Sequence, residues 1–171
     1  METVTDVAEP NVLLVGRPDA VDSTAAALCE VRPATDVTTA TCSERATELV
    51  EKGDIDCVVC AETLPDTDGV SVLYAIREYD QSLPAFLYAS DGSEELASEA
   101  ISAGVTDYIP LALTEERPTV LANRIRNAAE KYRAETALEA RERRLATINR
   151  LHRVLQDVTT SVIETPTREE M

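Results

Sequence analysis

Aromatic side chains are scarce in this 171-residue chain, where they make up 4% of the residues, and tryptophan is absent. The hydrophobic content of 44% therefore comes chiefly from alanine, valine and leucine. Such side chains suit strands that are buried on both faces of a parallel α/β sheet, and they argue against an aromatic-rich β-sandwich. The length allows one domain of about 110 to 130 residues with an appendage.

Lysine is nearly missing as well, since only Lys52 and Lys131 are present and the other basic residues are arginines. The 32 acidic residues outnumber the 16 basic ones, which gives a formal net charge of −16. An acidic, lysine-poor composition is typical of proteins from salt-loving microbes, whose cytoplasm screens charge strongly. An ordinary acidic protein is the alternative. In either case the charge opposes direct binding to nucleic acid, which requires a basic surface.

The sequence has no run of about 18 apolar residues, so it predicts no insertion into a membrane. Residues 1–6 lack the basic start and the apolar stretch of a secretory signal, and we expect a cytoplasmic protein with reduced cysteines. Cys57 and Cys60 have a C-x-x-C spacing. The two valines between them predict a strand, however, and strand positions three apart face opposite sides. We therefore expect neither a redox pair nor a metal site there.

Strand-like and helix-like segments alternate from residue 11 to residue 109. Runs of apolar or β-branched residues predict strands at residues 11–15, 36–41, 57–60, 85–89 and 106–109. Helical spacing of apolar residues predicts the intervening helices, with Asp19 as a possible cap of the first and Gly104 as the stop of the fourth. Five such units predict a flavodoxin-like, doubly wound α/β fold whose five parallel strands have the order 2-1-3-4-5.

Beyond Thr114 the sequence predicts one long helix that reaches about Val162, with Pro118 in its first turn. In the later part, apolar residues recur every seven positions in two lanes, that is, two rows along the helix surface. One lane holds Leu138 and Leu145, and the other holds Ile148, Leu155 and Val162. Arg141 and His152 interrupt these lanes, so the predicted coiled coil is imperfect. We expect this helix to form a parallel homodimer or to act as a signalling linker. His152 lacks the acidic neighbour usual after a phosphorylatable histidine, and we interpret it as a seam or surface residue.

Two motifs resemble those of a known family. Residues 61–69 read Ala-Glu-Thr-Leu-Pro-Asp-Thr-Asp-Gly after a predicted strand, and residues 92–108 run from a glycine through an acidic helix to Tyr108. On these motifs, residues 10 to about 127 resemble a response-regulator receiver domain. The resemblance is to the N-terminal receivers of haloarchaeal multidomain signalling proteins, which continue into sensor domains, a histidine kinase or a part like the bacterio-opsin activator. Residues 150–171 resemble the run-in to a GAF-type domain.

The resemblance implies two-component-type signal transduction and a division of the chain into four parts. We expect a disordered N-terminus at residues 1–9, a receiver-like domain at 10–117, a signalling or dimerisation helix at 118–163, and the start of a following domain or a disordered tail at 164–171. The receiver-like domain would then be a module that binds a signalling protein partner inside a larger sensor or regulator. No enzymatic activity is expected of this chain itself.

The positions that carry the chemistry of the family have all changed. The phosphoaccepting aspartate of receivers lies four residues before the loop proline, which here is Ala61, and a methyl group cannot form an acyl phosphate. The acidic pair that holds Mg²⁺ falls at Gly16 and Arg17, the hydroxyl at Ala89 and the lysine at Leu111. The resemblance thus implies a degenerate receiver that binds neither Mg²⁺ nor another cofactor.

Carboxylates remain close to the degenerate site at Glu62, Asp66 and Asp68. One alternative function is an atypical phosphoacceptor that uses Glu62 or Asp66. Without a metal ion or a lysine, however, the transferred group would lack electrostatic stabilisation. A sharper hypothesis is that Arg17 replaces the metal and forms an ion pair with Glu62 or Asp66.

Two further interpretations stay open. The pocket lined by Ala61, Ala89 and Leu111 would contain no catalytic side chain and could hold a small ligand. A ligand-sensing receiver is therefore an alternative function. Tyr108 falls at the position of the family's switch aromatic. It either presents its ring on a face used for docking or is a half-buried structural tyrosine.

Overall fold

The structure is a computed structural model that describes residues 8–90, 92–111 and 116–163. The chain forms two compact units, Met1–Arg133 and Ala134–Met171. The first unit contains the sheet and its covering helices, and the second contains the later part of the last helix. No helix in the described part of the chain combines the length and the apolar character that a membrane crossing requires.

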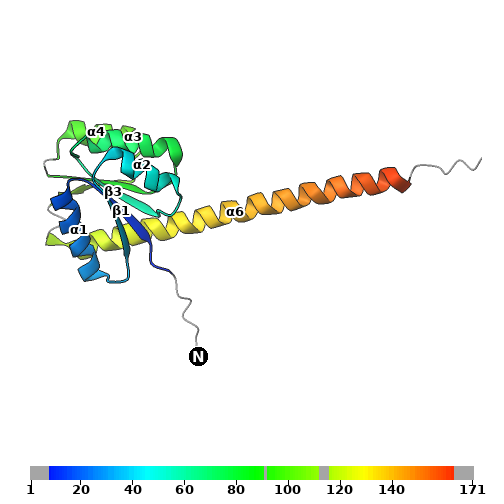
Figure 1. The fold of residues 1–171 in the computed structure, drawn as a ribbon, viewed down its shortest axis with the longest axis horizontal. Coiled ribbons are helices and arrows are strands. Elements are labelled where there is room, and N and C mark those ends of the chain that lie inside the picture. Colours follow the sequence, from blue (N-terminus) through cyan, green and yellow to red (C-terminus); the bar gives the residue numbers. More distant parts are fainter. Residues whose placement is uncertain (1–7, 91, 112–115, 164–171) are drawn as a thin grey trace, which may run out of the picture. The chain divides into compact units, whose positions relative to one another are not determined.

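Five short strands form one parallel sheet in the first unit (Figure 1). They are β1 (Asn11–Val15), β2 (Asp36–Ala40), β3 (Cys57–Ala61), β4 (Ala85–Ala89) and β5 (Asp107–Pro110). Their order across the sheet is β2-β1-β3-β4-β5. The predicted flavodoxin-like fold and its strand order are therefore confirmed.

Helices cover both faces of this sheet (Figure 1). One face packs against α2 (Ser43–Glu51), α3 (Gly69–Tyr79) and α4 (Glu94–Ser102) through a core that includes Leu13, Cys60 and Leu87. The other face packs against α1 (Pro18–Val31) and the beginning of α6 (Pro118–Ile163) through a core that includes Leu14, Val59 and Tyr88. Side chains of the three central strands are almost completely buried because helices lie on both sides.

Local sequence signals set the ends of these helices. Asp68 and Ser93 cap α3 and α4 by accepting hydrogen bonds from the backbone N–H groups of Ser71 and Leu96. Gly104 follows α4 with a φ of 79°, a conformation that glycine adopts without strain. The predicted cap at Asp19 is wrong, because α1 begins at Pro18 and its cap residue is Arg17. Proline is favoured at this first helical position, which explains the earlier start.

The first unit extends beyond the predicted domain boundary at residue 117. Leu121, Ile125 and Ala129 of α6 are buried in the core that also contains α1, so the first turns of the long helix complete the sheet's covering layer. The compact unit accordingly reaches Arg133. Since α6 continues through this boundary without a glycine or proline, the sequence pattern contains no break that marks it.

In the segment predicted to be disordered, the carbonyl groups of Ala8 and Glu9 accept hydrogen bonds from Arg133. Residues 1–7 and 164–171, to which the predicted terminal segments otherwise belong, lie outside the described residues.

The two buried cysteines of β3 lie on opposite faces of the sheet, as the strand pattern predicts. Cys57 belongs to the core on the α1 face and Cys60 to the core on the α3 face. Both thiols are free, and burial raises the pKa of each well above its usual range. The pair therefore has neither the geometry nor the thiolate character of a redox motif.

Candidate functional site

The carboxyl end of the sheet is closed by small and aromatic side chains. Ala61 ends β3 with only 6% of its surface exposed, and Tyr88 is its partner on β4. A Cβ atom placed on Gly16 would lie 2.9 Å from the Cβ atom of Ala61 and 3.2 Å from the hydroxyl oxygen of Tyr88. Real Cβ atoms essentially never approach within 3.0 Å, so any residue larger than glycine at this position would require β1 or β3 to shift. The end of β1 and the end of β3 are thus packed against each other, with the phenol beside them.

Tyr88 is the residue of this site that the sequence analysis did not identify. Its side chain is 4% exposed and belongs to the same core as Ala61 and Val21. Burial raises the pKa of Tyr88 to about 12, so the phenol is neutral near pH 7. The sequence contains a weak signal that Tyr88 belongs to this site. Tyr88 precedes Ala89 by one position, so alternation along the strand places the two side chains on opposite faces, with Tyr88 on the face of Ala61.

Ala89 and Leu111, at the predicted hydroxyl and lysine positions, do not line a shared pocket with Ala61. Ala89 is 2% exposed and pairs with Pro110, whereas Leu111 packs against the core on the α1 face. A surface groove of about 500 Å³ runs past Leu111 and Tyr88, and its other walls are side chains of α1. This groove is lined by Leu111 but not by Ala61 or Ala89, which are 6% and 2% exposed, so it differs from the ligand pocket that the sequence predicts.

Arg17 does not form the hypothesised ion pair with Glu62 or Asp66. Its guanidinium Nε lies 3.9 Å from the Oδ1 atom of Asp19, and its side chain is 64% exposed. This is a local contact at the start of α1. Exposed pairs of this kind contribute little to stability, because both side chains remain hydrated. The hypothesis that Arg17 replaces the metal ion is wrong for this structure.

Two of the remaining carboxylates cap helices. An Oδ atom of Asp66 accepts a hydrogen bond of 2.9 Å from the backbone N–H of Ser43, in the first turn of α2. Asp68 accepts bonds of 2.8 and 2.9 Å from the backbone N–H and the hydroxyl of Ser71. The backbone bond from Ser71 is the main reason why the pKa of Asp68 lies below its usual value. Both carboxylates are thus committed to local structure.

Glu62 follows Ala61 directly, and its backbone N–H donates to the carbonyl of Tyr88 over 2.9 Å. Glu62 lies just beyond the end of β3, in the bend that leads into the loop before α3. Among the residues that the structure describes, no three histidine, cysteine, aspartate or glutamate side chains gather into a possible metal site. The residues at this end of the sheet do not fit the Mg²⁺ of the receiver family: Gly16 has no side chain, Ala61 offers a methyl group and Arg17 is a cation.

Tyr108 is half-buried and packs against the core on the α3 face. A Cβ atom on Gly92 would lie 3.2 Å from the Tyr108 hydroxyl oxygen, so the tip of the ring lies against the loop between β4 and α4. These contacts favour the structural interpretation of Tyr108 over a ring that is displayed for docking.

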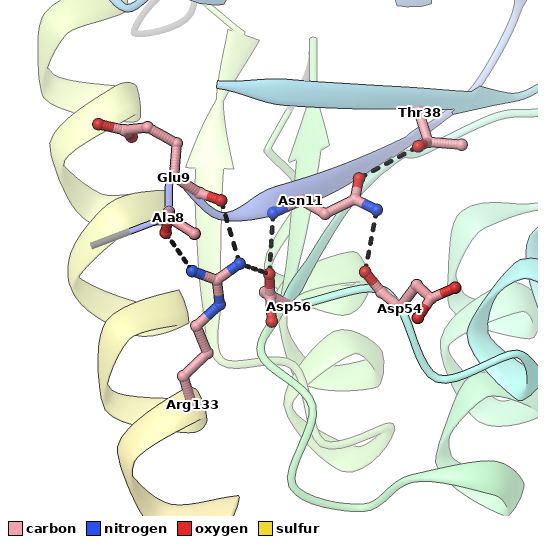
Figure 2. Close-up of polar contacts among 7 residues, drawn as sticks. All are labelled: Ala8, Glu9, Asn11, Thr38, Asp54, Asp56 and Arg133. Atoms are coloured by element: carbon pink, nitrogen blue, oxygen red, sulfur yellow. Dashed lines mark hydrogen bonds and ion pairs between the residues drawn. The ribbon is translucent and has the colours of Figure 1, made fainter. Parts of the chain in front are cut away.

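The amino end of the sheet holds a dense polar network (Figure 2). The guanidinium of Arg133 on α6 lies 2.5 Å from Oδ2 of Asp56 and donates to the carbonyl groups of Ala8 and Glu9. The same Asp56 oxygen accepts a bond of 2.8 Å from the backbone N–H of Asn11. Arg133 therefore joins α6 to the residues that precede β1 and β3.

The adjacent residue of α6 makes a second connection at this end. The Tyr132 hydroxyl donates a hydrogen bond of 2.6 Å to Oδ2 of Asp80, which lies in the loop before β4. Burial alone would raise the pKa of Asp80, but the bonds from Tyr132, Ser82 and the Leu83 backbone outweigh it and lower that pKa. Two consecutive side chains, Tyr132 and Arg133, thus fix α6 immediately before the second compact unit begins.

The predicted seam residues of the later part of α6 are all exposed. Leu138, Leu145, Ile148, Leu155 and Val162 have between 45% and 69% of their surfaces accessible. The structure adds three exposed apolar residues that the seven-residue repeat did not include: Leu151, Val154 and Val158.

Comparison with known proteins agrees with the fold of the first unit. The sequence model of the response regulator receiver domain matches residues 12–120, more than half of the chain. The crystal structure of a CheY-like receiver domain protein from Methanospirillum hungatei superposes with a TM-score of 0.65 at 20% identity, and the match covers 74% of this chain and 98% of that one. The sheet and its helices define a receiver fold. The chain belongs to the response regulator receiver domain family.

Two relatives are similar over about half of this chain. The bacterioopsin transcriptional activator of Halobacterium salinarum is 31% identical over 91 residues, which are 53% of this chain and 13% of that protein. The regulatory protein LuxO of Vibrio cholerae is 28% identical over 88 residues, which are 52% of this chain and 19% of that protein. The matched part is therefore a small fraction of each relative.

Proposed function

We propose that this chain is a phosphorylation-incompetent receiver that acts as a protein-interaction and dimerisation module within a larger sensor or regulator of two-component-type signalling. The observation that carries the proposal is the contact of Gly16, Ala61 and Tyr88 at the carboxyl end of the sheet. Phosphoryl transfer to a carboxylate requires a nucleophilic oxygen and positive charge to stabilise the transferred group. Gly16 and Ala61 have no side-chain oxygen, the phenol of Tyr88 is neutral near pH 7, and none of the three residues carries a positive charge.

The atypical phosphoacceptor is the competing function, and the roles of the nearby carboxylates argue against it. Asp66 and Asp68 are occupied as helix caps. A phosphoryl group on either one would remove a cap and would face no lysine or metal ion. Glu62 lies beyond the end of β3, and a phosphoryl group on it would have no metal ion and no lysine at the family's position, where Leu111 stands, to stabilise its charge.

The experiment is incubation of the protein with acetyl phosphate and Mg²⁺, followed by intact-mass measurement. We expect no change in mass, while an active receiver treated in parallel gains one phosphoryl group. A gain that hydroxylamine removes would contradict the proposal. Glu62→Gln and Asp66→Asn variants would then identify the acceptor.

Dimerisation forms the second part of the proposal, and its support is the row of exposed apolar side chains on α6. A helix with such a row is stabilised by packing against another helix. Light scattering in molar salt should give the mass of a dimer, and Leu155→Asn should reduce it to that of a monomer. A wild-type monomer at tens of micromolar protein would contradict this part.

The remaining parts of the proposal concern partners and location. With a net charge of −16, the chain should act on another signalling protein rather than on nucleic acid. We propose a cytoplasmic location and no catalytic activity for the chain itself. The small share of each relative that the match covers supports a larger parent protein, in which a histidine kinase or a regulatory output is the working part.

A further inference from the structure

The apolar residues on the second part of α6 follow two different lanes. Ile148, Leu151, Leu155, Val158 and Val162 are separated by alternating steps of three and four residues, which is the spacing of coiled-coil core positions. Upstream, Leu138, Leu145 and Ile148 are separated by seven and three residues. The steps from Leu145 to Ile148 and from Ile148 to Leu151 are both three, so the alternation fails at Ile148.

Because the alternation of steps is broken at Ile148, different lanes are apolar before and after this residue. The lane of Leu138 and Leu145 continues downstream into His152 and Thr159, which are polar. The lane of Leu151 and Val158, followed upstream, reaches the charged Arg144. Each of the two lanes therefore supplies large apolar side chains on only one side of Ile148. The lane of Ile148, Leu155 and Val162 belongs to both seams, and upstream it holds Arg141, the residue that interrupts the seam there.

A second copy of this chain is the occupant that the charge distribution favours. Residues 134–163 carry five arginines and four carboxylates, which leaves them near neutrality in a chain of net charge −16. Two copies of the acidic first unit repel each other, whereas two copies of this helix do not. Sustained core spacing on an exposed helix also suits an identical helix, because equal seams align layer by layer.

We propose that residues 134–162 of two copies form a parallel coiled coil whose seam changes lane at Ile148, from Leu138 and Leu145 to Leu151 and Val158. The inference rests on the dimer of the proposed function and specifies how its helices meet. An additional step of three residues overwinds a coiled coil locally. The stretch from Leu145 to Leu151 is accordingly the place where the two helices change their relative rotation, and His152 lies outside the core.

Disulfide cross-linking of single cysteines tests the lane change. The background carries Cys29→Ser and Cys42→Ser, because Cys57 and Cys60 are buried and do not react. Identical positions in a parallel pair approach closely enough for a disulfide only in the core. We expect cysteines at Leu138, Leu145, Leu151 and Val158 to cross-link about tenfold faster than cysteines at His152 and Thr159. Arg150→Cys and Asp157→Cys report the background rate on the outer face.

The other outcomes have distinct meanings. Fast cross-linking at His152 and Thr159 with slow cross-linking at Leu151 and Val158 would indicate one continuous seam and overturn the lane change, while the dimer would stand. In mixtures of two single-cysteine variants, cross-links that form between different positions and not between identical ones would indicate antiparallel helices and would also overturn the inference. Background rates at every position, with a monomer in light scattering, would refute the dimer itself.

A pair of double variants provides a second measurement that does not depend on cysteine chemistry. Leu151→Asn with Val158→Asn should convert the dimer to a monomer in light scattering. His152→Asn with Thr159→Asn should leave it a dimer. The opposite result would contradict the lane change. Circular dichroism checks that the first unit keeps its fold in both variants.

Discussion

The two ends of the sheet differ in how they are held together. At the carboxyl end, where receivers carry their chemistry, Gly16, Ala61 and Tyr88 meet through van der Waals contacts, and the ion pair of Arg17 is local and exposed. At the amino end, Asp56 and Asp80 bind Arg133 and Tyr132 of α6. The first unit therefore has the receiver architecture without the family's polar residues at its carboxyl end, and its amino end is held by the polar contacts of Tyr132 and Arg133.

Removal of the phenol at the carboxyl end should have the largest effect. Tyr88→Ala deletes a ring that is 96% buried, and the expected loss of unfolding free energy is about 3–5 kcal/mol. Tyr74→Ala is the matched control, because this tyrosine is 51% exposed on α3 and should change stability by about 0.5 kcal/mol or less. Urea unfolding measures both. Equal losses would mean that Tyr88 does not close the site.

The amino end is tested by a comparison of two arginines. Arg133→Ala leaves Asp56 and two carbonyl groups without their guanidinium, and we expect a loss of about 2–3 kcal/mol. Arg17→Ala removes an exposed pair and should change stability by about 0.5 kcal/mol or less. If urea unfolding gives the same value for both variants, the network at the amino end does not anchor α6.

The close approach of β1 and β3 gives a smaller effect with a specific suppressor. Gly16→Ala places a Cβ atom 2.9 Å from that of Ala61, and the expected loss is about 1–3 kcal/mol. In an Ala61→Gly background this clash is absent, so the same substitution should cost less. A double-mutant cycle by thermal unfolding measures the coupling. Additive losses would show that the two positions do not touch.

The smallest expected effect is a pH dependence at the amino end. The pKa of Asp80 is lowered in the folded state, so the folded protein binds its proton less readily than the unfolded chain does. The stabilisation by ionised Asp80 is present above the unfolded pKa of about 4 and is lost as the pH falls through the folded pKa. Asp80→Asn should therefore be less stable than wild type at pH 7, and the difference should shrink towards pH 3. A difference independent of pH would exclude this role.

Most strands and helix ends of the fold can be predicted from local sequence patterns. The alternation of short apolar runs with helical spacing predicts the five strands, and the glycines after α2 and α4 have the positive φ angles that end a helix. The sequence pattern does not separate the first turns of α6 from the later ones, because the helix runs on without interruption. Only the burial of Leu121, Ile125 and Ala129 distinguishes them from the later turns.

The sequence predicts which catalytic residues the site lacks, but it does not predict which side chains pack there instead. Ala61 is found at the phosphoacceptor position by counting four residues back from Pro65. Gly16 and Leu111 are found at their positions by similar counts along the sequence. The approach of the Tyr88 hydroxyl to Gly16 depends on the register of β3 with β4 and on the reach of a side chain across the sheet. The partner of Arg17 was predicted wrongly because a long exposed side chain has several carboxylates within reach, and weak local contacts decide among them.

The most direct test of the central claim is an amide NMR spectrum of the isotopically labelled protein, titrated with Mg²⁺ and then with beryllium fluoride, a mimic of the phosphoryl group. The closed carboxyl end predicts no saturable shift for the amides of Ala61, Glu62, Ala89 or Tyr108. Saturable shifts that are confined to these residues and require both additives would show that this end of the sheet still binds a cation and a phosphoryl group, and would contradict the account.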